Sequence, residues 1–313
     1  MIRDDLNTLP LPDLFARLTS TGLVERLLDL AHAEDLGVHG DVTSRACLTE
    51  DRAGVAHVVA RRAGVISGLA VLPLVAARFA PDVRVETLHV DGTPAGPGDV
   101  LATLRGPLRP ILAMERTALN LVGRLSGIAS LTRSHVGAIP PGARAALYDT
   151  RKTTPGLRVL EKYAVRCGGG RCHRLGLHDA LLIKDNHLAG VSTRDLPGFV
   201  AAAVARGRAF APIAFAQVEA DTLDQVEALL TLPPGTIDII LLDNMPPADL
   251  AKAARMRDAR NPGLELEASG GVTLGTIPVI ATTGVDRISV GALTHHAVSL
   301  DVALDVEPDA GAA

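Results

Sequence analysis

Residues 237–244 read Ile-Asp-Ile-Ile-Leu-Leu-Asp-Asn, an aliphatic run that ends abruptly in a carboxylate and an amide. A short run with so little polar alternation is typical of a parallel strand that is buried on both faces. The same pattern occurs six times in the second half of the chain. The predicted strands lie near residues 145–149, 180–184, 213–218, 237–242, 264–268 and 287–290.

Helix-like stretches separate most of these runs, and the later connections take about 20 residues, enough for a helix and a right-handed return. Alternating strands and helices predict an α/β fold with a parallel sheet. Six strands fall short of the usual eight, so we predict an incomplete TIM-like barrel with a six-stranded core. A doubly wound open sheet is the structural alternative.

The first half of the chain has a different pattern. Residues 23–36 predict an amphipathic helix, and residues 55–60, 83–90 and 99–104 are β-rich runs split by Gly and Pro clusters. Residues 107–136 predict a long helix. We therefore expect an N-terminal α/β sandwich-like domain over residues 1–115 and the barrel over residues 116–292. The tail, residues 293–313, is expected to pack on the N-terminal domain.

Composition narrows the class of protein. Apolar residues make up 47% of the 313 residues but aromatics only 2%, so the core must be built from aliphatic side chains. The net charge is 31 − 35 = −4, which gives no sign of nucleic-acid binding. No run of about 18 apolar residues is present to span a membrane. Three cysteines are an odd and sparse set, which favours a reducing cytoplasm over a disulfide framework.

Cationic residues gather near the ends of the predicted strands. The carboxyl ends of strands in a parallel barrel meet at one rim, where such folds bind and react. Arginine and lysine there suit a carboxylate or phosphate ligand. The cationic candidates are Arg116, Arg151, Lys152, His173, Arg174 and Lys184. Gly168, Gly169 and Gly170 precede His173, and they either end a helix or form a loop that closes over an anion.

Two carboxylates, Glu219 and Asp243, follow or end aliphatic strands, where an uncompensated charge is costly to bury. Oxygen ligands of this kind suit Mg²⁺, which takes one or two carboxylates plus substrate phosphates or water. A salt bridge to a neighbouring Lys or Arg is the alternative. A zinc site built from Cys167, Cys172 and His173 with His178 matches no finger spacing.

Two late strands end in small residues. Ser269, Gly270 and Gly271 follow one strand, and Val290, Gly291 and Ala292 end the next. Glycine lets backbone N–H groups approach a phosphate, and helix N-termini add partial positive charge. Barrels often bind phosphate at this position. The two loops therefore predict a phosphate site.

Taken in order, these segments resemble the quinolinate phosphoribosyltransferase family, also called nicotinate-nucleotide pyrophosphorylase (carboxylating), from about residue 25 to residue 305. Motifs this long, in this order, are highly specific. The matching stretches are residues 33–37, 115–120, 125–129, 149–156, 161–165, 168–170, 173–174, 182–187, 242–244, 267–271 and 290–294.

The resemblance implies a reaction in NAD biosynthesis. Quinolinate and phosphoribosyl pyrophosphate give nicotinate mononucleotide, CO₂ and pyrophosphate, with Mg²⁺ as cofactor. It also implies an N-terminal α/β domain, a defective barrel and a homodimer in which Arg116 reaches into the partner's site; a higher oligomer stays open. No nucleic acid or membrane takes part.

The resemblance also assigns roles to residues. It places Thr150, Arg151, Lys152, His173, Arg174 and Lys184 around quinolinate. Glu219 and Asp243 serve the ribose hydroxyls and the metal, directly or through substrate and water. Residues 269–271 and 290–292 take the phosphoribosyl phosphate. We expect Lys152, Glu219 and Asp243 to be the catalytic residues.

This chain departs from the family pattern at four places. Cys172 replaces a common Asn, Gln217 replaces a frequent Glu, residues 38–39 add one residue, and His296 replaces a small polar residue. Two other functions stay open from the sequence: transfer to another pyridine carboxylate, and a non-catalytic barrel that binds phosphorylated metabolites. The number of cations favours a substrate with two carboxylates, and the presence of both Glu219 and Asp243 favours catalysis.

Overall fold

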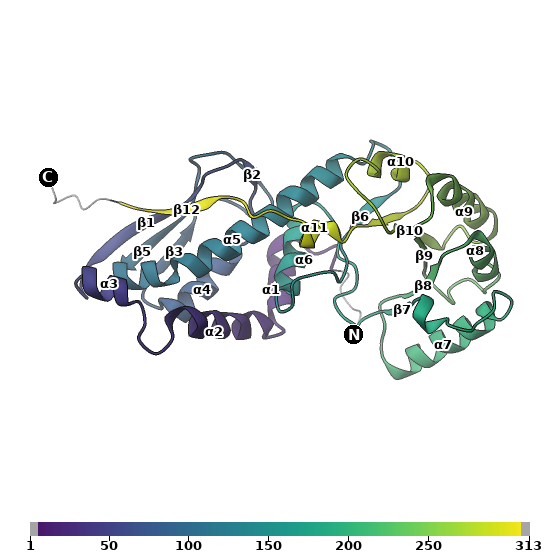
Figure 1. Cartoon of the computed structure of the whole chain (residues 1–313), viewed down its shortest axis with the longest axis horizontal. Coiled ribbons are helices and arrows are strands. Elements are labelled where there is room, and N and C mark those ends of the chain that lie inside the picture. The colour runs from purple at the N-terminus through teal and green to yellow at the C-terminus, as the bar shows by residue number, and fades with distance from the viewer. Residues whose placement is uncertain (1–5, 308–313) are drawn as a thin grey trace. The chain divides into compact units, whose positions relative to one another are not determined.

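The computed structural model describes residues 6–307, and the chain divides into two compact units. The described part of the antiparallel unit comprises residues 6–133, 153–169 and 293–307. The barrel unit comprises residues 134–152 and 170–292. Figure 1 labels the elements of both units. The expected boundaries after residues 115 and 292 stay a prediction.

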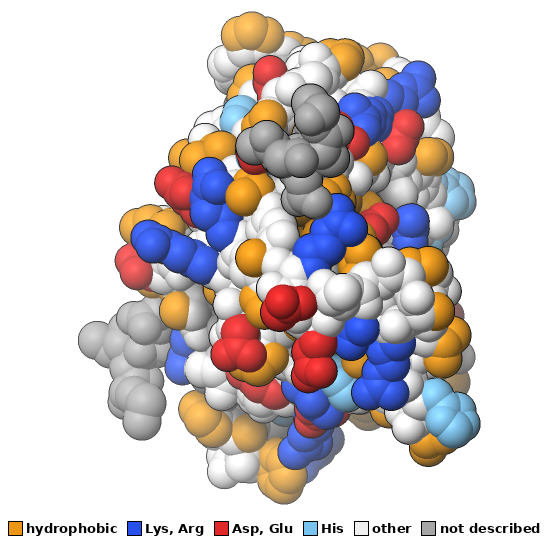
Figure 2. Space-filling model, turned by 90° about the vertical axis from the view of Figure 1, so that its left-hand side faces the viewer, with side chains coloured by type: hydrophobic (Ala, Val, Ile, Leu, Met, Phe, Trp, Pro, Cys, Tyr) orange, Lys and Arg blue, Asp and Glu red, His pale blue; other side chains and the backbone are white. Residues whose placement is uncertain are grey.

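Charges of both signs are mixed on the surface. In the face drawn in Figure 2, blue Lys and Arg side chains alternate with red Asp and Glu side chains. This mixture agrees with the small net charge of −4. Within residues 6–307, no helix is long and apolar enough to cross a membrane.

The antiparallel unit is built on a four-stranded sheet with the order β12-β1-β5-β3. Its strands are β1 (Ala53–Ala60), β3 (Arg84–Thr87), β5 (Val100–Pro107) and β12 (Val302–Val306). The last strand of the chain pairs antiparallel with β1, so the tail completes this sheet. A second small sheet pairs β2 (Gly64–Val65) with β4 (Pro94–Ala95).

Two of the predicted N-terminal strands are confirmed and the third is shorter than predicted. The run expected over residues 83–90 forms a strand only at Arg84–Thr87. The N–H groups of Leu88 and His89 both bond to the Leu101 carbonyl, at 2.9 and 3.2 Å, so the regular ladder ends there. The sequence pattern alone does not show where the strand pairing ends.

Helices pack against these sheets. They are α1 (Leu11–Thr19), α2 (Leu23–Leu36), α3 (Val42–Cys47), η1 (Leu69–Val71), α4 (Leu72–Phe79), α5 (Leu108–Gly137) and α6 (Arg158–Cys167). The helix predicted over residues 23–36 has the predicted bounds, and the long helix predicted over 107–136 is α5. On α5, a Cβ added at Gly127 would lie 2.1 Å from the Val298 carbonyl oxygen. Glycine is therefore needed where the segment leading to β12 crosses this helix.

Helix α6 belongs to the antiparallel unit although barrel segments flank it in sequence. Glu161, which is fully buried, accepts hydrogen bonds from Arg124 Nη2 at 2.9 Å and from the Thr154 N–H at 3.0 Å. Tyr163 donates its hydroxyl hydrogen to Asp91 Oδ2 at 3.0 Å. Burial raises the pKa of Asp91, while hydrogen bonds from the Leu69 and Ala70 N–H groups and from the Tyr163 hydroxyl oppose the rise. Buried polar contacts thus hold this short helix against the rest of the antiparallel unit.

The barrel unit contains six parallel strands in the order β6-β11-β10-β9-β8-β7. The strands are β6 (Ala146–Tyr148), β7 (Leu181–Ile183), β8 (Ala216–Ala220), β9 (Ile239–Asp243), β10 (Glu265–Ser269) and β11 (Arg287–Ser289). The helices are η2 (Asp185–His187), α7 (Leu196–Phe210), α8 (Leu223–Leu229), α9 (Pro247–Arg260), α10 (Ile277–Ala281) and α11 (Ala292–His295). The predicted α/β class and the six-stranded parallel sheet are confirmed.

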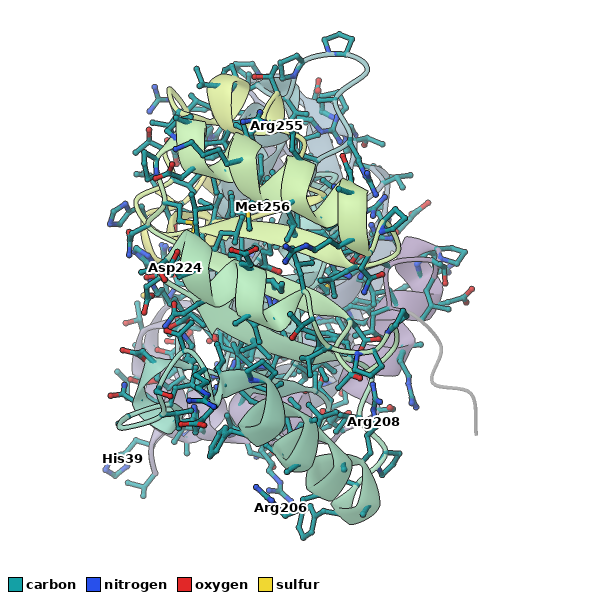
Figure 3. All side chains as sticks on the ribbon, turned by 90° about the vertical axis from the view of Figure 1, so that its right-hand side faces the viewer. His39, Arg206, Arg208, Asp224, Arg255 and Met256 are labelled. Atoms are coloured by element: carbon teal, nitrogen blue, oxygen red, sulfur yellow. The ribbon has the colours of Figure 1, made fainter. Side chains whose placement is uncertain are left out.

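Figure 3 shows α7, α8 and α9 side by side in front of the strands. Arg206 and Arg208 lie on α7, Asp224 on α8, and Arg255 and Met256 on α9. The third strand was predicted two to three residues too early, at 213–218 instead of Ala216–Ala220. A loop over residues 211–215 follows α7, and pairing of Val218 with Ile240 sets the register. Glu219 therefore lies inside the strand.

The sheet is open between its edge strands β6 and β7, and the segment 171–174 lies along β6 at this opening. The Arg171 N–H donates to the Leu147 carbonyl at 2.8 Å, and the Asp149 N–H donates to the Arg171 carbonyl at 2.9 Å. On the other side, Arg174 Nη1 donates to the Ala180 carbonyl, just before β7, at 3.2 Å. An irregular segment thus takes the place of missing strands, as an incomplete barrel requires.

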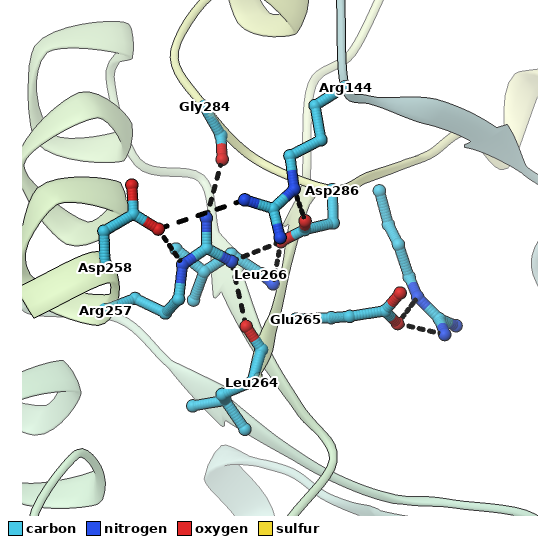
Figure 4. A network of polar contacts seen from close by, with 9 residues as sticks. Arg144, Arg257, Asp258, Leu264, Glu265, Leu266, Gly284 and Asp286 are labelled. Atoms are coloured by element: carbon cyan, nitrogen blue, oxygen red, sulfur yellow. Dashed lines mark hydrogen bonds and ion pairs between the residues drawn. The ribbon is translucent and has the colours of Figure 1, made fainter. Parts of the chain in front are cut away.

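A buried guanidinium ties together the segments that lead into β10 and β11 (Figure 4). Arg257, which is fully buried, donates to Asp286 Oδ2 at 2.5 Å, to the Leu264 carbonyl at 2.8 Å and to the Gly284 carbonyl at 3.0 Å. Asp286 also pairs with Arg144 and accepts the Leu266 N–H at 2.8 Å. These contacts lie at the amino ends of the strands, where barrel residues serve stability.

Candidate active site

The strand register gathers the predicted polar residues on one face of the parallel sheet. Side chains alternate between faces along a strand. Glu219 on β8 and Glu267 on β10 both pair with Leu241 of the intervening strand, and Asp243 pairs with Ser269. These side chains therefore share a face, with Asp243 and Ser269 nearer the carboxyl ends.

Lys184 and Glu219 form an ion pair on this face. Lys184 Nζ lies 2.7 Å from Glu219 Oε2, and the Asp185 N–H approaches Glu219 Oε1 at 3.5 Å. The Glu219 side chain is only 6% exposed, whereas that of Lys184 is 45% exposed. The salt bridge that the sequence left open is thus present, and it joins a predicted cation to a predicted carboxylate.

Further carboxylates surround this pair. Burial and the charge of Glu219 raise the pKa of Asp243, against the opposing hydrogen bond from Asn244 and the charge of Lys184. Burial, Glu219 and Asp185 likewise raise the pKa of Asp221, which lies just after β8. One lysine therefore does not neutralise this group of carboxylates, and a cation bound there would relieve the repulsion.

Two arginines form the cationic side of the site. Arg174 is 8% exposed, and burial followed by the charge of Arg151 lowers its pKa. The N–H of Lys152 donates to Thr150 Oγ1 at 3.0 Å, a local turn that shapes the loop carrying Arg151 and Lys152 after β6. Two guanidinium groups crowded together in a poorly solvated place favour an anionic ligand.

His173 directly precedes Arg174 in the chain. It is 8% exposed, and its main-chain N–H donates to Asp149 Oδ1 at 2.7 Å. Its ring nitrogens lie 2.8 Å from the Arg174 N–H and 2.9 Å from Gln217 Oε1. The ring therefore makes contacts with both the cationic segment and the sheet.

The glycines of the predicted phosphate loop adopt left-handed backbone conformations, with φ of 88° at Gly270 and 60° at Gly271. A Cβ at Gly270 would lie 2.2 Å from Asn244 Oδ1, so this position also needs glycine for space. Asn244 is itself left-handed, with φ of 52°, and donates to Asp243 Oδ2 at 2.6 Å. Successive left-handed residues expose N–H groups that suit an anion.

Helix dipoles add less to the phosphate loops than expected. The helix after Gly271 begins only at Ile277, and the helix after Gly291 has four residues, Ala292–His295. Val290 is buried, and Gly291 and Ala292 are partly exposed. Helix N-termini therefore contribute little here, and the Val290 N–H already donates to the Tyr148 carbonyl at 3.0 Å.

The triple glycine is explained by packing in the antiparallel unit. A Cβ at Gly168 would lie 2.5 Å from the Ala129 carbonyl oxygen on α5, and Gly169 has a φ of 90°. The reading as the end of a helix is confirmed, because α6 ends at Cys167. Arg116 lies on α5 in the same unit, 66% exposed and 4.0 Å from Glu115, and its role across a dimer interface stays a prediction.

Sequence reasoning missed several residues of the site. Asp149, Asp221, Asn244 and Glu267 were not chosen, and Gln217 was noted only as a departure. An acidic residue within an aliphatic strand was a usable signal for Glu267, which is 1% exposed. Burial raises the pKa of Glu267, but His173, Ser289 and Arg287 outweigh that effect and lower it overall.

No group of three or more His, Cys, Asp or Glu side chains is arranged to hold a metal ion within residues 6–307. A magnesium ion does not need such a group, because one or two carboxylates suffice when phosphates and water supply the other ligands. Glu219 and Asp243 meet that requirement. Within residues 6–307, Cys47, Cys167 and Cys172 are not in disulfide bonds, and burial raises the pKa of Cys167 to about 12.

The fold and the site define a barrel-type α/β protein whose strand ends suit anionic ligands. Comparison with protein families identifies which one. Residues 41–126 match the N-terminal domain of quinolinate phosphoribosyl transferase, and residues 128–305 match its C-terminal domain. The chain belongs to the quinolinate phosphoribosyltransferase family.

Curated relatives and solved structures agree. The chain is 44% identical over 275 residues to the nicotinate-nucleotide pyrophosphorylase [carboxylating] of Mycobacterium leprae, covering 87% of this chain and 93% of that protein. It is 38% identical over 284 residues to a probable nicotinate-nucleotide pyrophosphorylase [carboxylating] of Bacillus subtilis, covering 90% and 93%. The nicotinate-nucleotide pyrophosphorylase structure from Francisella tularensis aligns with a TM-score of 0.80 at 33% identity, covering 97% and 99%.

Proposed function

We propose that the chain transfers the phosphoribosyl group of phosphoribosyl pyrophosphate to quinolinate with decarboxylation, giving nicotinate mononucleotide, CO₂ and pyrophosphate in NAD biosynthesis. The observation that carries the proposal is the division of the barrel face into two charged sides. Arg151 and Arg174 lie close together on one side, Glu219 and Asp243 occupy the other, and Lys184 pairs with Glu219. A dicarboxylate and a metal-bound diphosphate need these opposite charges.

The cationic side would hold quinolinate. Its two adjacent carboxylates call for several donors, and guanidinium groups provide paired N–H donors that match them. Thr150, Arg151, Lys152 and Arg174 with Lys184 supply hydroxyl, guanidinium and ammonium groups in this unit. Held in place, the ring nitrogen is oriented to attack the anomeric carbon, so these residues act by positioning.

The carboxylate side would hold the ribose and the metal. Glu219 and Asp243 are proposed to bind the ribose hydroxyls and Mg²⁺, in part through water. When bound, Mg²⁺ neutralises the charge that develops on the departing pyrophosphate. The same carboxylates stabilise the cationic sugar of the transition state. Ser269, Gly270 and Gly271, with residues 290–292, are proposed to bind the 5′-phosphate.

Decarboxylation needs little from the protein. The pyridinium formed by the transfer stabilises the electron pair left on the ring carbon when the carbon–carboxylate bond breaks and CO₂ leaves, and that carbon then takes a proton from water. Arg151, Lys152 and Arg174 would hold the remaining carboxylate while this happens. No covalent intermediate with a side chain is required, which agrees with a site made of charged and hydrogen-bonding groups.

Two properties follow from the family and are proposed for this chain. It would act as a homodimer in which Arg116, exposed on α5, enters the partner's quinolinate site. It would reside in the cytoplasm, where its three thiols stay reduced.

A direct assay tests the proposal. Pure protein is incubated with quinolinate, phosphoribosyl pyrophosphate and Mg²⁺, and nicotinate mononucleotide and CO₂ are measured. Nicotinate replaces quinolinate in a parallel reaction, and EDTA replaces Mg²⁺ in another. We expect product only with quinolinate and metal, because nicotinate leaves buried cations unpaired. Comparable turnover of nicotinate would contradict the substrate, and full activity in excess EDTA would contradict the metal.

A further inference from the structure

The His173 ring is held by the protein at both nitrogens. Nδ1 lies 2.8 Å from the Arg174 main-chain nitrogen, and Nε2 lies 2.9 Å from Gln217 Oε1. A main-chain N–H can only donate, so Nδ1 must be the acceptor and carries no hydrogen. The ring is then neutral, with its single N–H at Nε2, which donates to Gln217.

The orientation of Gln217 agrees with this tautomer. Gln217 is fully buried on β8, and with its oxygen facing His173 its Nε2 has no acceptor among the described residues. Leaving a buried amide donor unpaired is costly, but in the reverse orientation the amide N–H groups would face the Nε2–H of the neutral ring. A charged carboxylate at this position would instead favour the doubly protonated ring.

Charged groups of both signs lie near the ring. Glu267 Oε2 lies 3.3 Å from Nε2 and favours a proton on the ring, and Asp149 accepts from the main chain of His173. Arg287 opposes this with positive charge near Glu267. Protonation of Nδ1 would also break the bond from the Arg174 N–H. Gln217 is neutral and adds no negative charge beside the ring.

We propose that Gln217 is a positioning residue that holds His173 as the neutral Nε2–H imidazole, so that His173 fixes the Arg174 main chain and carries neither charge nor a transferred proton. The proposal rests on the proposed function, because Arg174 is assigned there to quinolinate. Under this proposal, the positive charge of the site comes from residues such as Arg151, Arg174 and Lys184, and not from His173. It also makes Gln217 a determinant of how tightly quinolinate binds.

The tautomer can be measured without turnover. The full-length protein is labelled with ¹⁵N-histidine, and long-range ¹H–¹⁵N correlations of the imidazoles are recorded at about pH 7. The His173→Asn variant identifies the His173 signals. We expect one bare and one protonated nitrogen, with the hydrogen on Nε2, and we expect both nitrogens protonated in Gln217→Glu. An imidazolium or an Nδ1–H tautomer in the unsubstituted protein would overturn the proposal.

Kinetics separate positioning from proton transfer. In His173→Asn the side-chain oxygen can replace Nδ1 as acceptor for the Arg174 N–H, whereas His173→Leu cannot accept. We expect KM for quinolinate to rise about tenfold or more in His173→Leu and clearly less in His173→Asn. His178→Asn, the same change at an exposed histidine of the barrel unit, is the control.

A fall in kcat of about 10² or more in His173→Asn, with a lost limb of the pH profile, would indicate acid–base catalysis and refute positioning. Equal KM values for the Asn and Leu variants would refute it as well. Failure of the unsubstituted protein to form nicotinate mononucleotide would remove the proposed function and leave the tautomer measurement standing.

Discussion

Replacing Arg174 by glutamine tests the cationic side of the site most directly. Arg174 is 8% exposed, and burial and the nearby charge of Arg151 lower its pKa, so the ligand-free protein holds two like charges close together. A bound dicarboxylate would relieve this repulsion. Truncating one partner of a buried charge pair costs about 2–5 kcal/mol, which corresponds to a loss of about 30-fold to several thousandfold in affinity.

Thermal unfolding with and without quinolinate measures this loss independently of catalysis. At a ligand concentration of about 100 Kd, binding stabilises the folded state by about 2.7 kcal/mol. If Arg174→Gln weakens binding about 100-fold, the same concentration gives only about 0.4 kcal/mol. The stabilisation by quinolinate should therefore nearly vanish in the variant.

The ligand-free variant should remain folded. Arg174→Gln loses a hydrogen bond to the Ala180 carbonyl, but it also removes the repulsion from Arg151. Arg255→Gln is the matched control, because Arg255 is exposed on α9 (Figure 3). Undiminished stabilisation by quinolinate in Arg174→Gln, with the control also unchanged, would show that Arg174 does not bind the substrate.

Three further predictions concern other parts of the chain. Asp243→Asn should cut turnover by orders of magnitude without lowering Tm near neutral pH. The raised pKa of Asp243 means that its ionised form is disfavoured in the folded state, and this free-energy penalty is relieved as pH falls through the folded pKa. A marked loss of Tm in Asp243→Asn would contradict the prediction. Arg257→Met should destabilise the barrel unit by about 3–5 kcal/mol, because it removes the buried partner of Asp286; a denaturant titration that finds no loss would refute it. Arg116→Ala and Lys152→Ala chains, each inactive alone, should regain about a quarter of wild-type activity when mixed, since half of the dimers are mixed and each has one intact site. A mixture that stays inactive after subunit exchange, verified by mass, would place Arg116 in its own chain's site.

The sequence was sufficient to predict the six parallel strands and several of the residues at their ends. Buried parallel strands read as aliphatic runs, and a charged residue after such a run lies at the carboxyl rim. This reasoning predicted Lys184 and Asp243 in their observed places on the sheet. It was less accurate for Glu219, because the start of β8 depends on pairing with β9, which is not encoded in the run itself.

The remaining site residues depend on contacts between distant segments. The role of Gln217 becomes visible only when residue 173, which is 44 positions away, lies across its amide. The Asn244 side chain occupies the space beside Gly270, a contact between adjacent loops. Local propensity carries no information on such pairs, so neither could be chosen from a single sequence.

The last prediction concerns the Lys184–Glu219 ion pair, which joins a cation of the site to a carboxylate. Lys184 Nζ lies 2.7 Å from Glu219 Oε2 in the ligand-free structure. A carboxylate of quinolinate that draws Lys184 away would leave Glu219 with the repulsion of Asp243 and Asp221, and this raises its attraction for Mg²⁺. Quinolinate and magnesium pyrophosphate should then bind with positive coupling of about 5-fold or more.

Calorimetric titration of quinolinate with and without magnesium pyrophosphate, which cannot react with it to form the mononucleotide, measures this coupling. In Lys184→Met the coupling should fall toward unity, because Glu219 is then unpaired before either ligand binds. Lys252→Met, at an exposed lysine on α9, is the control and should keep the coupling. By linkage, magnesium pyrophosphate must gain from quinolinate the same factor that quinolinate gains from it. Equal coupling in Lys184→Met and in the unsubstituted protein would mean that the two charged sides act independently.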